Sequence, residues 1–280
     1  MPETPHQLQD AARERERAAA DHLSRVNGTL GLHAAVLALL LPTGSRRAGR
    51  AWQVETEAMP GAAALREHIE SLSPAARLPW LDVLLVRMRG QPLAARQALL
   101  ESTRRVMAAR RVVRPLDRLH WLLMRQRLGE SSAAAVQAAA QTELSHLPQG
   151  DVSAIARYSA FLSRMVPVEA DEPAATAGPN AGAVWYATVM ARWERHATIP
   201  PCEPPDADGL VHALQQLQAL AWMQRPVLVR DWVTAAHQHS RHGRLTDVAA
   251  DALRLSCALL DSPLPPDLER HYRAAGQRSP

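Results

Sequence analysis

The sequence predicts an all-α protein of about a dozen helices, arranged as two subdomains that are built from helix hairpins. Hydrophobic residues make up 47% of the 280-residue chain and aromatic residues only 4%. Alanine and leucine, which are strong helix formers, supply most of this apolar content. Proline and glycine recur between the apolar segments at intervals typical of helices of about 10 to 20 residues.

Seven helices are expected in the first half of the chain. Gly28 is suited to end the first helix in a left-handed conformation, and Ser73 with Pro74 is suited to begin the fifth. In the sixth helix, apolar positions such as Leu99 and Val106 fall on one face, which predicts packing against a core. The expected ranges are Gln7–Asn27, Thr29–Leu41, Arg46–Ala58, Ala62–Leu72, Pro74–Arg89, Pro92–Arg110 and Pro115–Leu128.

A segment rich in proline, alanine and glycine, Val166–Gly182, lacks apolar periodicity and is the expected linker between the subdomains. The predicted division is an N-terminal subdomain of residues 1–165, the linker 166–182, and a C-terminal subdomain of residues 183–280. Two weaker helices precede the linker, and four helices and a short helical turn follow it. The expected ranges are Ser131–His146, Val152–Met165, Ala183–His196, Leu210–Met223, Pro226–Arg241 and Asp247–Leu260.

Two helix pairs follow one pattern, which suggests a weak internal repeat. A proline opens the first helix and an arginine follows four residues later, at Pro92 and Arg96 in one copy and at Pro226 and Arg230 in the other. A short basic loop then leads to a second helix in each copy. The few identities predict two helix hairpins of similar build and leave a true duplication open.

Charge and cysteine usage argue against several classes of protein. All 32 basic residues are arginines, and the net charge of +4 is spread along the chain without a block of like charges. Because nucleic-acid-binding motifs and aromatic interleaving are absent, no nucleic-acid partner is expected. Cys202 and Cys257 are too few and too far apart for a disulfide framework or a zinc cluster, which favours a reducing compartment.

Membrane and export signals are not expected either. The longest apolar run, Leu32–Pro42, is well short of the roughly 20 residues that a membrane-spanning helix needs. The first 17 residues are polar throughout and do not resemble a cleavable signal. We therefore expect a cytoplasmic protein with no transmembrane segment of its own.

Three histidines in six residues, His237, His239 and His242, raise the question of a metal site. Residues two apart on a helix point about 200 degrees apart, so His237 and His239 cannot bind one metal ion together. We expect His239 to be partly buried on an apolar flank. Gly243 is suited to end this helix and Thr246 to cap the next, so the stretch predicts a helix corner.

Other catalytic signatures are also missing, since the sequence has no phosphate-binding loop, Walker sequence or G-x-S-x-G elbow. Cys202 has no histidine at motif spacing, and Asp206 and Asp208 are suited to cap the helix that follows them. We predict no catalytic, cofactor-binding or metal-binding residue. The seven tryptophans are expected to mark the core or helix interfaces rather than a ligand: Trp52, Trp80, Trp121, Trp185, Trp193, Trp222 and Trp232.

The stretch "HGRLTDVAADALRLSCALLDSPLPP", residues 242–266, resembles the end of the cytoplasmic C-terminal region of bacterial membrane-bound zinc metalloproteases of the CAAX-prenyl-protease-like class. There a loop reading Asp-Gly-x-Val-Thr-x-x-Glu leads into a helix with Leu-Leu-Arg and ends at a Pro-x-Pro-Pro stop. Residues 77–100, beginning "RLPWLD", and residues 33–42, "HAAVLALLLP", resemble earlier parts of that region. Its hairpins are similar to those of tellurite-resistance TerB-like domains, so the resemblance implies TerB-like helix hairpins from about residue 30 to residue 266.

The zinc-binding H-E-x-x-H helix of such proteases does not occur here. The nearest fragments, "REHIESL" from Arg66 and "ERHAT" from Glu194, both lack the second histidine. The resemblance therefore carries no proteolytic activity over to this chain.

The acidic loop is altered in both copies. His242 and Ala249 stand in place of its Asp and Glu, and Arg110 and Arg111 occupy the Asp-Gly place of the first copy. If family members use the carboxylates to bind a cation, this chain lacks the ligands. Alternatively, Thr and Glu three residues apart form a capping box, of which Ala249 removes the returning half.

The leading hypothesis is a non-catalytic helical interaction or regulatory module, related to the cytoplasmic region of a membrane metalloprotease. Its partner would be a protein, such as a membrane protease that holds it at the inner face of the membrane. One alternative is the detached C-terminal part of a zinc metalloprotease whose active site lies elsewhere. Another is an enzyme of unrecognised type that uses His237, Asp247 or Glu194 in a cleft near the linker.

Overall fold

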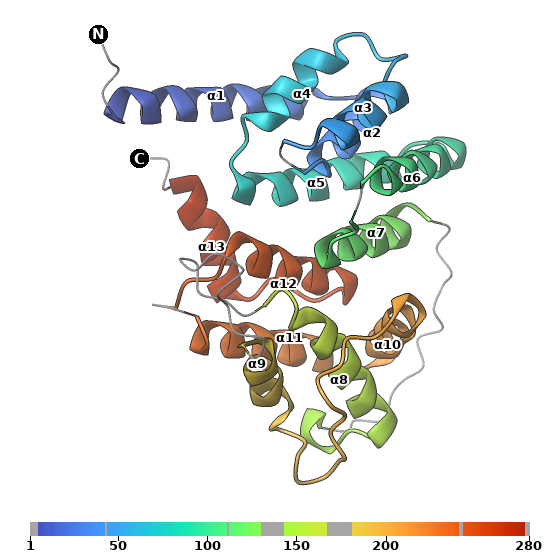
Figure 1. Cartoon of the computed structure of the whole chain (residues 1–280), viewed down its shortest axis with the longest axis vertical. Helices are drawn as coiled ribbons and strands as arrows, with labels where there is room; N and C mark the ends of the chain where they lie inside the picture. The colour runs from blue at the N-terminus through green and yellow to red at the C-terminus, as the bar shows by residue number, and fades with distance from the viewer. Residues whose placement is uncertain are drawn as a thin grey trace. The chain divides into compact units, whose positions relative to one another are not determined.

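The computed structural model describes residues 5–42, 44–110, 112–129, 143–166, 181–240 and 243–277, and all regular structure in these ranges is helical. Thirteen α-helices and one short 3₁₀ helix, η1, follow one another along this described part of the chain (Figure 1). The prediction of an all-α fold with about a dozen helices is confirmed. No helix among the described residues combines the length and the apolar character needed to cross a membrane.

The chain forms two compact units, and the division differs from the predicted one. Unit 1 comprises Met1–Ser131 with Tyr272–Pro280, and unit 2 comprises Ser132–His271. The sequence placed residues 152–165 in the N-terminal subdomain, but helix α8 (Gln149–Leu162) packs on α9 (Ala181–Met190) and α10 (Ala207–Ala219), which belong to unit 2. The expected linker, 166–182, lies mostly outside the described residues. The predicted helix Ser131–His146 is described only from residue 143, where Leu144–His146 forms η1.

Unit 1 is built around helix α2. Six consecutive residues of this helix, Ala34–Leu39, are buried, so it is covered on every side. It packs on α3, α4, α5 and α6, while α7 packs on α5 and α6. The helices of unit 1 are α1 (Pro5–Arg25), α2 (Thr29–Leu39), α3 (Arg46–Glu55), α4 (Ala62–Glu70), α5 (Pro74–Arg89), α6 (Leu93–Ala108) and α7 (Pro115–Leu128).

Arginine side chains close the ends of helices in unit 1. The last carbonyl groups of a helix have no partner within it, and a guanidinium offers several N–H donors in one plane. Arg87 donates to the carbonyls of Leu23, Ser24 and Val26 just at and after the end of α1, each at 3.1 Å. Arg77 does the same at the end of α2. It donates to the carbonyls of Ala38, Leu39 and Leu41, again at 3.1 Å.

Unit 2 encloses a core rich in aromatic side chains. Tyr158, Trp185 and Trp232 are fully buried. Trp185 donates to the carbonyl of Trp232 at 3.3 Å, and the indole of Trp232 donates to the hydroxyl of Ser159 at 3.0 Å. Each buried N–H of these side chains therefore has an acceptor, as such groups require. With α8, α9 and α10, the unit contains α11 (Gln224–Gln238), α12 (Asp247–Leu259) and the start of α13 (Pro266–Gln277).

Two predicted helix starts are confirmed, whereas two glycines that were expected to end helices lie elsewhere. Gly28 and Gly243 have positive φ angles of 74° and 69°. The Thr246 hydroxyl accepts from the amide of Ala249 at 3.1 Å, and the Asp206 carboxylate accepts from the amide of Gly209 at 2.7 Å. The predicted N-caps Asp206 and Thr246 are therefore confirmed. Gly28 instead stands at the start of α2, and Gly243 lies beyond His239, the residue at which α11 ends.

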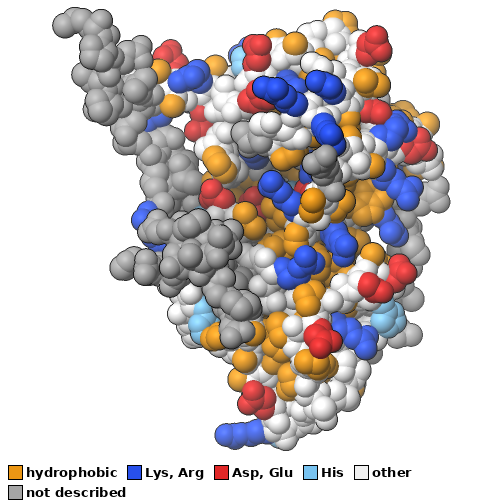
Figure 2. All heavy atoms as spheres, in the orientation of Figure 1, with side chains coloured by type: hydrophobic (Ala, Val, Ile, Leu, Met, Phe, Trp, Pro, Cys, Tyr) orange, Lys and Arg blue, Asp and Glu red, His pale blue; other side chains and the backbone are white. Residues whose placement is uncertain are grey.

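Two side-chain predictions differ from the structure. Trp222, expected in the core or at a helix interface, is 76% exposed, because it follows the end of α10 in the short connection to α11. Ser73 precedes α5 as predicted, but its side chain does not cap the helix; its hydroxyl donates instead to Glu16 at 2.5 Å. On the face seen in Figure 2, arginine and acidic side chains are interspersed with hydrophobic ones, so neither sign of charge dominates it.

Candidate functional site

A cleft of about 510 Å³ lies between α3 and α4 in unit 1. The C-terminal half of α3, the loop of residues 56–61 and the outer face of α4 form its walls, and it is open to solvent. Its volume falls in the range of ligand pockets, about 300 to 1,000 Å³. Apolar side chains such as Met59 and Ala62 line it together with charged ones.

The α3 wall is fixed to the rest of unit 1 at two points. The indole of Trp52 is buried and donates to the carbonyl of Ala34 in α2 at 3.1 Å. The carboxylate of Glu55 accepts two hydrogen bonds from Arg105 in α6, at 2.6 and 2.8 Å. This two-point contact with Arg105 lowers the pKa of Glu55 to about 2. The wall therefore has defined anchors in both neighbouring helices.

The α4 wall begins at Gly61, whose φ angle of 79° lies in the left-handed region that favours glycine. Leu65 and Ile69 on this helix are buried against the core. The face of α4 beside this buried one turns towards the cleft. That face carries Arg66 and Glu70, one helical turn apart.

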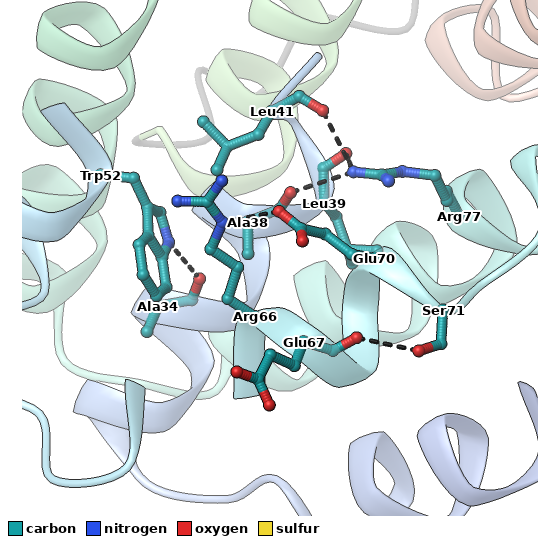
Figure 3. Close-up of polar contacts among 10 residues, drawn as sticks. All are labelled: Ala34, Ala38, Leu39, Leu41, Trp52, Arg66, Glu67, Glu70, Ser71 and Arg77. Atoms are coloured by element: carbon teal, nitrogen blue, oxygen red, sulfur yellow. Dashed lines mark hydrogen bonds and ion pairs between the residues drawn. The ribbon is translucent and has the colours of Figure 1, made fainter. Parts of the chain in front are cut away.

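Arg66 is the side chain that joins the two walls. Its Nε donates to Glu70 Oε1 at 2.7 Å, and its guanidinium lies 5.6 Å from the centre of the Trp52 ring (Figure 3). A Cβ atom at Gly49 of α3 would lie 2.8 Å from Nη1 of Arg66, so the missing side chain of Gly49 makes room for the guanidinium. Trp52, Glu70 and Gly49 thus form a seat for a guanidinium group, which Arg66 occupies. We call these three residues the guanidinium seat.

The cleft carries more negative than positive charge. Glu57, Glu67 and Glu70 line it against the single guanidinium of Arg66. Glu57 and Glu67 are exposed, and within the described part of the chain no cation forms an ion pair with either carboxylate. The cleft can therefore attract cationic groups by charge.

The described residues of the histidine stretch, 237–240 and 243–246, span the end of α11 and the connection to α12, where the sequence predicts a helix corner. Nδ1 of His237 lies 2.8 Å from the carbonyl of Gly243, and Nε2 of His239 lies 2.7 Å from the hydroxyl of Thr188. Both side chains are half-buried, which confirms the expectation for His239. His242 lies outside the described residues. In the described ranges there is no group of three or more His, Cys, Asp or Glu side chains placed to hold a metal ion.

The other residues considered from the sequence have separate neighbours. Asp247 lies 3.3 Å from His271, and Glu194 is exposed in the turn that follows α9. The Sγ of Cys202 lies 3.4 Å from the hydroxyl of Ser163. Cys257 is buried, which raises the pKa of its thiol to about 12. His237 and Asp247 therefore contact different residues of unit 2, and Glu194 is exposed apart from both.

The sequence analysis did not predict the cleft, although the spacing of two of its residues predicts that they are in contact. Arg66 and Glu70 are four residues apart in an expected helix, a spacing that predicts contact. Trp52 and Gly49 belong to another helix, and nothing in the sequence indicates that they meet Arg66. Comparisons of the chain with protein-family models, with curated proteins and with solved structures found no match.

Proposed function

We propose that this chain is a non-catalytic helical interaction module, and that it binds a partner protein at the cleft between α3 and α4. The observation that carries the proposal is the cleft itself, which combines apolar lining residues, two exposed carboxylates and a wall that Trp52 and Glu55 anchor to α2 and α6. Interfaces commonly pair a central apolar contact with a polar rim. A site on two anchored helices also needs little ordering when a partner binds.

The openness of the cleft favours a protein over an enclosed small molecule. Ligand pockets for small molecules usually bury most of the ligand surface. Here Glu57 and Glu67 remain exposed at the rim, where side chains of a protruding segment could reach both. A segment of a partner protein therefore fits this geometry best.

The choice of partner comes from the sequence. The stretches that resemble the cytoplasmic region of membrane metalloproteases suggest a bacterial membrane protease, or a protein associated with one. In this role the chain would bind or regulate the protease from the cytoplasmic side. The catalytic residues would belong to the partner.

Affinity capture from the native host, with two charge variants, tests the proposal. The double variant E57Q/E67Q neutralises the exposed rim, while E194Q/E203Q removes two exposed carboxylates of unit 2 and serves as the control. We expect one partner to be retained by the wild type and the control and to be lost with E57Q/E67Q. Equal retention by all three proteins, or peptide cleavage by the purified chain alone, would overturn the proposal.

A further inference from the structure

We infer that the cleft is a receptor for a basic segment of the partner, and that an arginine of this segment takes the guanidinium seat from Arg66. This inference rests on the proposed function and adds the chemical class of the ligand. Three observations support it: the charge of the cleft, the shape of the guanidinium seat and the exposure of Arg66.

Charge selects a cationic ligand. Three glutamates line the cleft, and Arg66 balances only one of them. An approaching anion would meet two uncompensated carboxylates, at Glu57 and Glu67, whereas a segment with two positive side chains would complement them. Opposite charges at a rim mainly raise the rate and the selectivity of binding.

The seat selects a guanidinium among cations. Its three parts are the ring face of Trp52, the carboxylate of Glu70 and the bare backbone of Gly49. A planar guanidinium can stack on an aromatic ring while it donates to a carboxylate, whereas an ammonium group is a compact and strongly hydrated charge. Arg66 demonstrates that the seat holds this group.

Arg66 is placed so that it can leave. Its side chain remains 28% exposed and its partner Glu70 is 52% exposed. Ion pairs in such solvent-exposed positions contribute little to stability. When Arg66 swings out, the ring of Trp52 and the carboxylate of Glu70 are freed together, so a partner arginine gains both contacts at once.

Titration with short capped peptides, followed by the Trp52 indole N–H resonance, tests the inference. The probes are acetyl-Arg-Arg-amide, acetyl-Lys-Lys-amide, acetyl-Gln-Gln-amide and spermidine, added to the full chain. We expect the arginine peptide to shift the Trp52 resonance most and the glutamine peptide not to shift it. In the wild type only those molecules in which Arg66 has left the seat can bind the peptide, and the apparent affinity is reduced in proportion to that fraction. R66A should therefore bind the arginine peptide about tenfold more tightly than the wild type.

Two further variants complete the design. E70Q in the R66A background should lose the gained affinity, whereas E14Q, which changes an exposed glutamate of α1 outside the cleft, should bind as the wild type does. The remaining amide resonances of each variant report whether it is folded. A folded R66A that binds the arginine peptide no more tightly than the wild type would overturn the inference.

The control ligands distinguish a peptide ligand from other cationic ligands. A response to spermidine without a response to the arginine peptide would assign the cleft to a small polyamine and overturn the inference of a peptide ligand. If no probe binds while partner capture still depends on Glu57 and Glu67, the inference fails and the proposed function stands. If the arginine peptide binds while no captured protein depends on the rim, the proposed function fails, and the basic segment must come from another source.

Discussion

The guanidinium of Arg96, at the start of α6, donates a 3.3 Å hydrogen bond to the carbonyl of Leu128, the last residue of α7. In unit 2, Arg225 at the start of α11 donates to the carbonyl of Leu260, just after α12, at the same distance. Both helix pairs therefore use an arginine of the first helix to close the end of the second. The sequence pattern paired Arg96 with Arg230, but the structural counterpart is Arg225, because Arg230 is exposed.

This correspondence predicts unequal effects of two neighbouring substitutions in α11. Arg225 donates to the carbonyls of both Leu220 and Leu260, and lysine cannot reproduce two directed bonds from one planar group. We expect R225K to lower the free energy of unfolding by about 1 to 2 kcal/mol. R230K should change it by less than about 0.5 kcal/mol, as substitutions at the surface usually do. Urea denaturation followed by circular dichroism measures both, and equal effects would contradict the pairing of Arg225 with Arg96.

Arg87 provides a stronger case in unit 1. Its Nη1 group shares two N–H donors among three carbonyls at and after the end of α1. The shorter lysine side chain does not bring its ammonium group to the same point, so R87K should cost about 1 to 3 kcal/mol. Arg89 on the same helix is exposed, and R89K is the matched control. Hydrogen exchange at the C-terminal amides of α1 should accelerate in R87K alone. Unchanged exchange there would show that Arg87 does not hold the end of this helix.

A buried pair of hydroxyl groups joins α8 to α12 in unit 2. Tyr158 and Ser256 lie 3.1 Å apart, and the Ser256 hydroxyl also donates to the carbonyl of Ala252 at 2.8 Å. The tyrosine is therefore the donor within the pair. S256A leaves a buried O–H without an acceptor and should cost about 2 kcal/mol or more, whereas Y158F should cost about 1 kcal/mol.

The double variant Y158F/S256A tests whether these two hydroxyls interact. It removes both hydroxyls, so no buried donor remains without an acceptor. Its loss of stability should be smaller than the sum of the two single losses. Strict additivity in urea denaturation would show that Tyr158 and Ser256 do not interact.

His33 should make unit 1 less stable in mild acid. Burial in α2 lowers its pKa below the usual 6.5, with Arg105 acting in the same direction and Glu55 opposing it. The folded state therefore binds fewer protons than the unfolded state around and below pH 6.5. Stability is complete above this pH and falls as the pH decreases. Glu55 stays ionised over this range because its own pKa is about 2.

The variant H33Q isolates this effect. Because glutamine does not titrate, H33Q should show a flatter decline of the urea midpoint between about pH 6.5 and pH 4 than the wild type. H212Q, at an exposed histidine of α10, serves as the control and should keep the profile of the wild type. If the urea midpoint of H33Q depends on pH as that of the wild type does, groups other than His33 cause the loss of stability in acid.

Local signals allowed most helices to be predicted from the sequence. The ranges Pro74–Arg89 and Pro115–Leu128 match α5 and α7 at both ends, because each begins with a proline and is followed by a glycine. Such signals act within a few residues and need no knowledge of packing. The last helix, α13, is longer than the short helical turn that was predicted. The prediction was too short because this helix follows the proline stop and its sequence is mostly polar.

Tertiary packing decided what the sequence could not. The unit that contains α8 depends on its contacts with α10, more than 40 residues later in the chain, and composition placed the boundary after α8 instead. The guanidinium seat likewise depends on α3 and α4 packing side by side around Arg66. A spacing rule can pair Arg66 with Glu70, but it cannot bring Trp52 to them.

Site-specific photo-crosslinking in the native host shows whether a partner protein binds in the cleft between α3 and α4. A photoreactive amino acid replaces Ala63, an exposed residue of the cleft lining, and in a control protein it replaces Glu194 of unit 2. We expect one crosslinked partner protein from position 63, none from position 194, and loss of the crosslink when Glu57 and Glu67 are changed to glutamine. The same crosslinks from both positions, or a crosslink at position 63 that persists in E57Q/E67Q, would contradict this expectation.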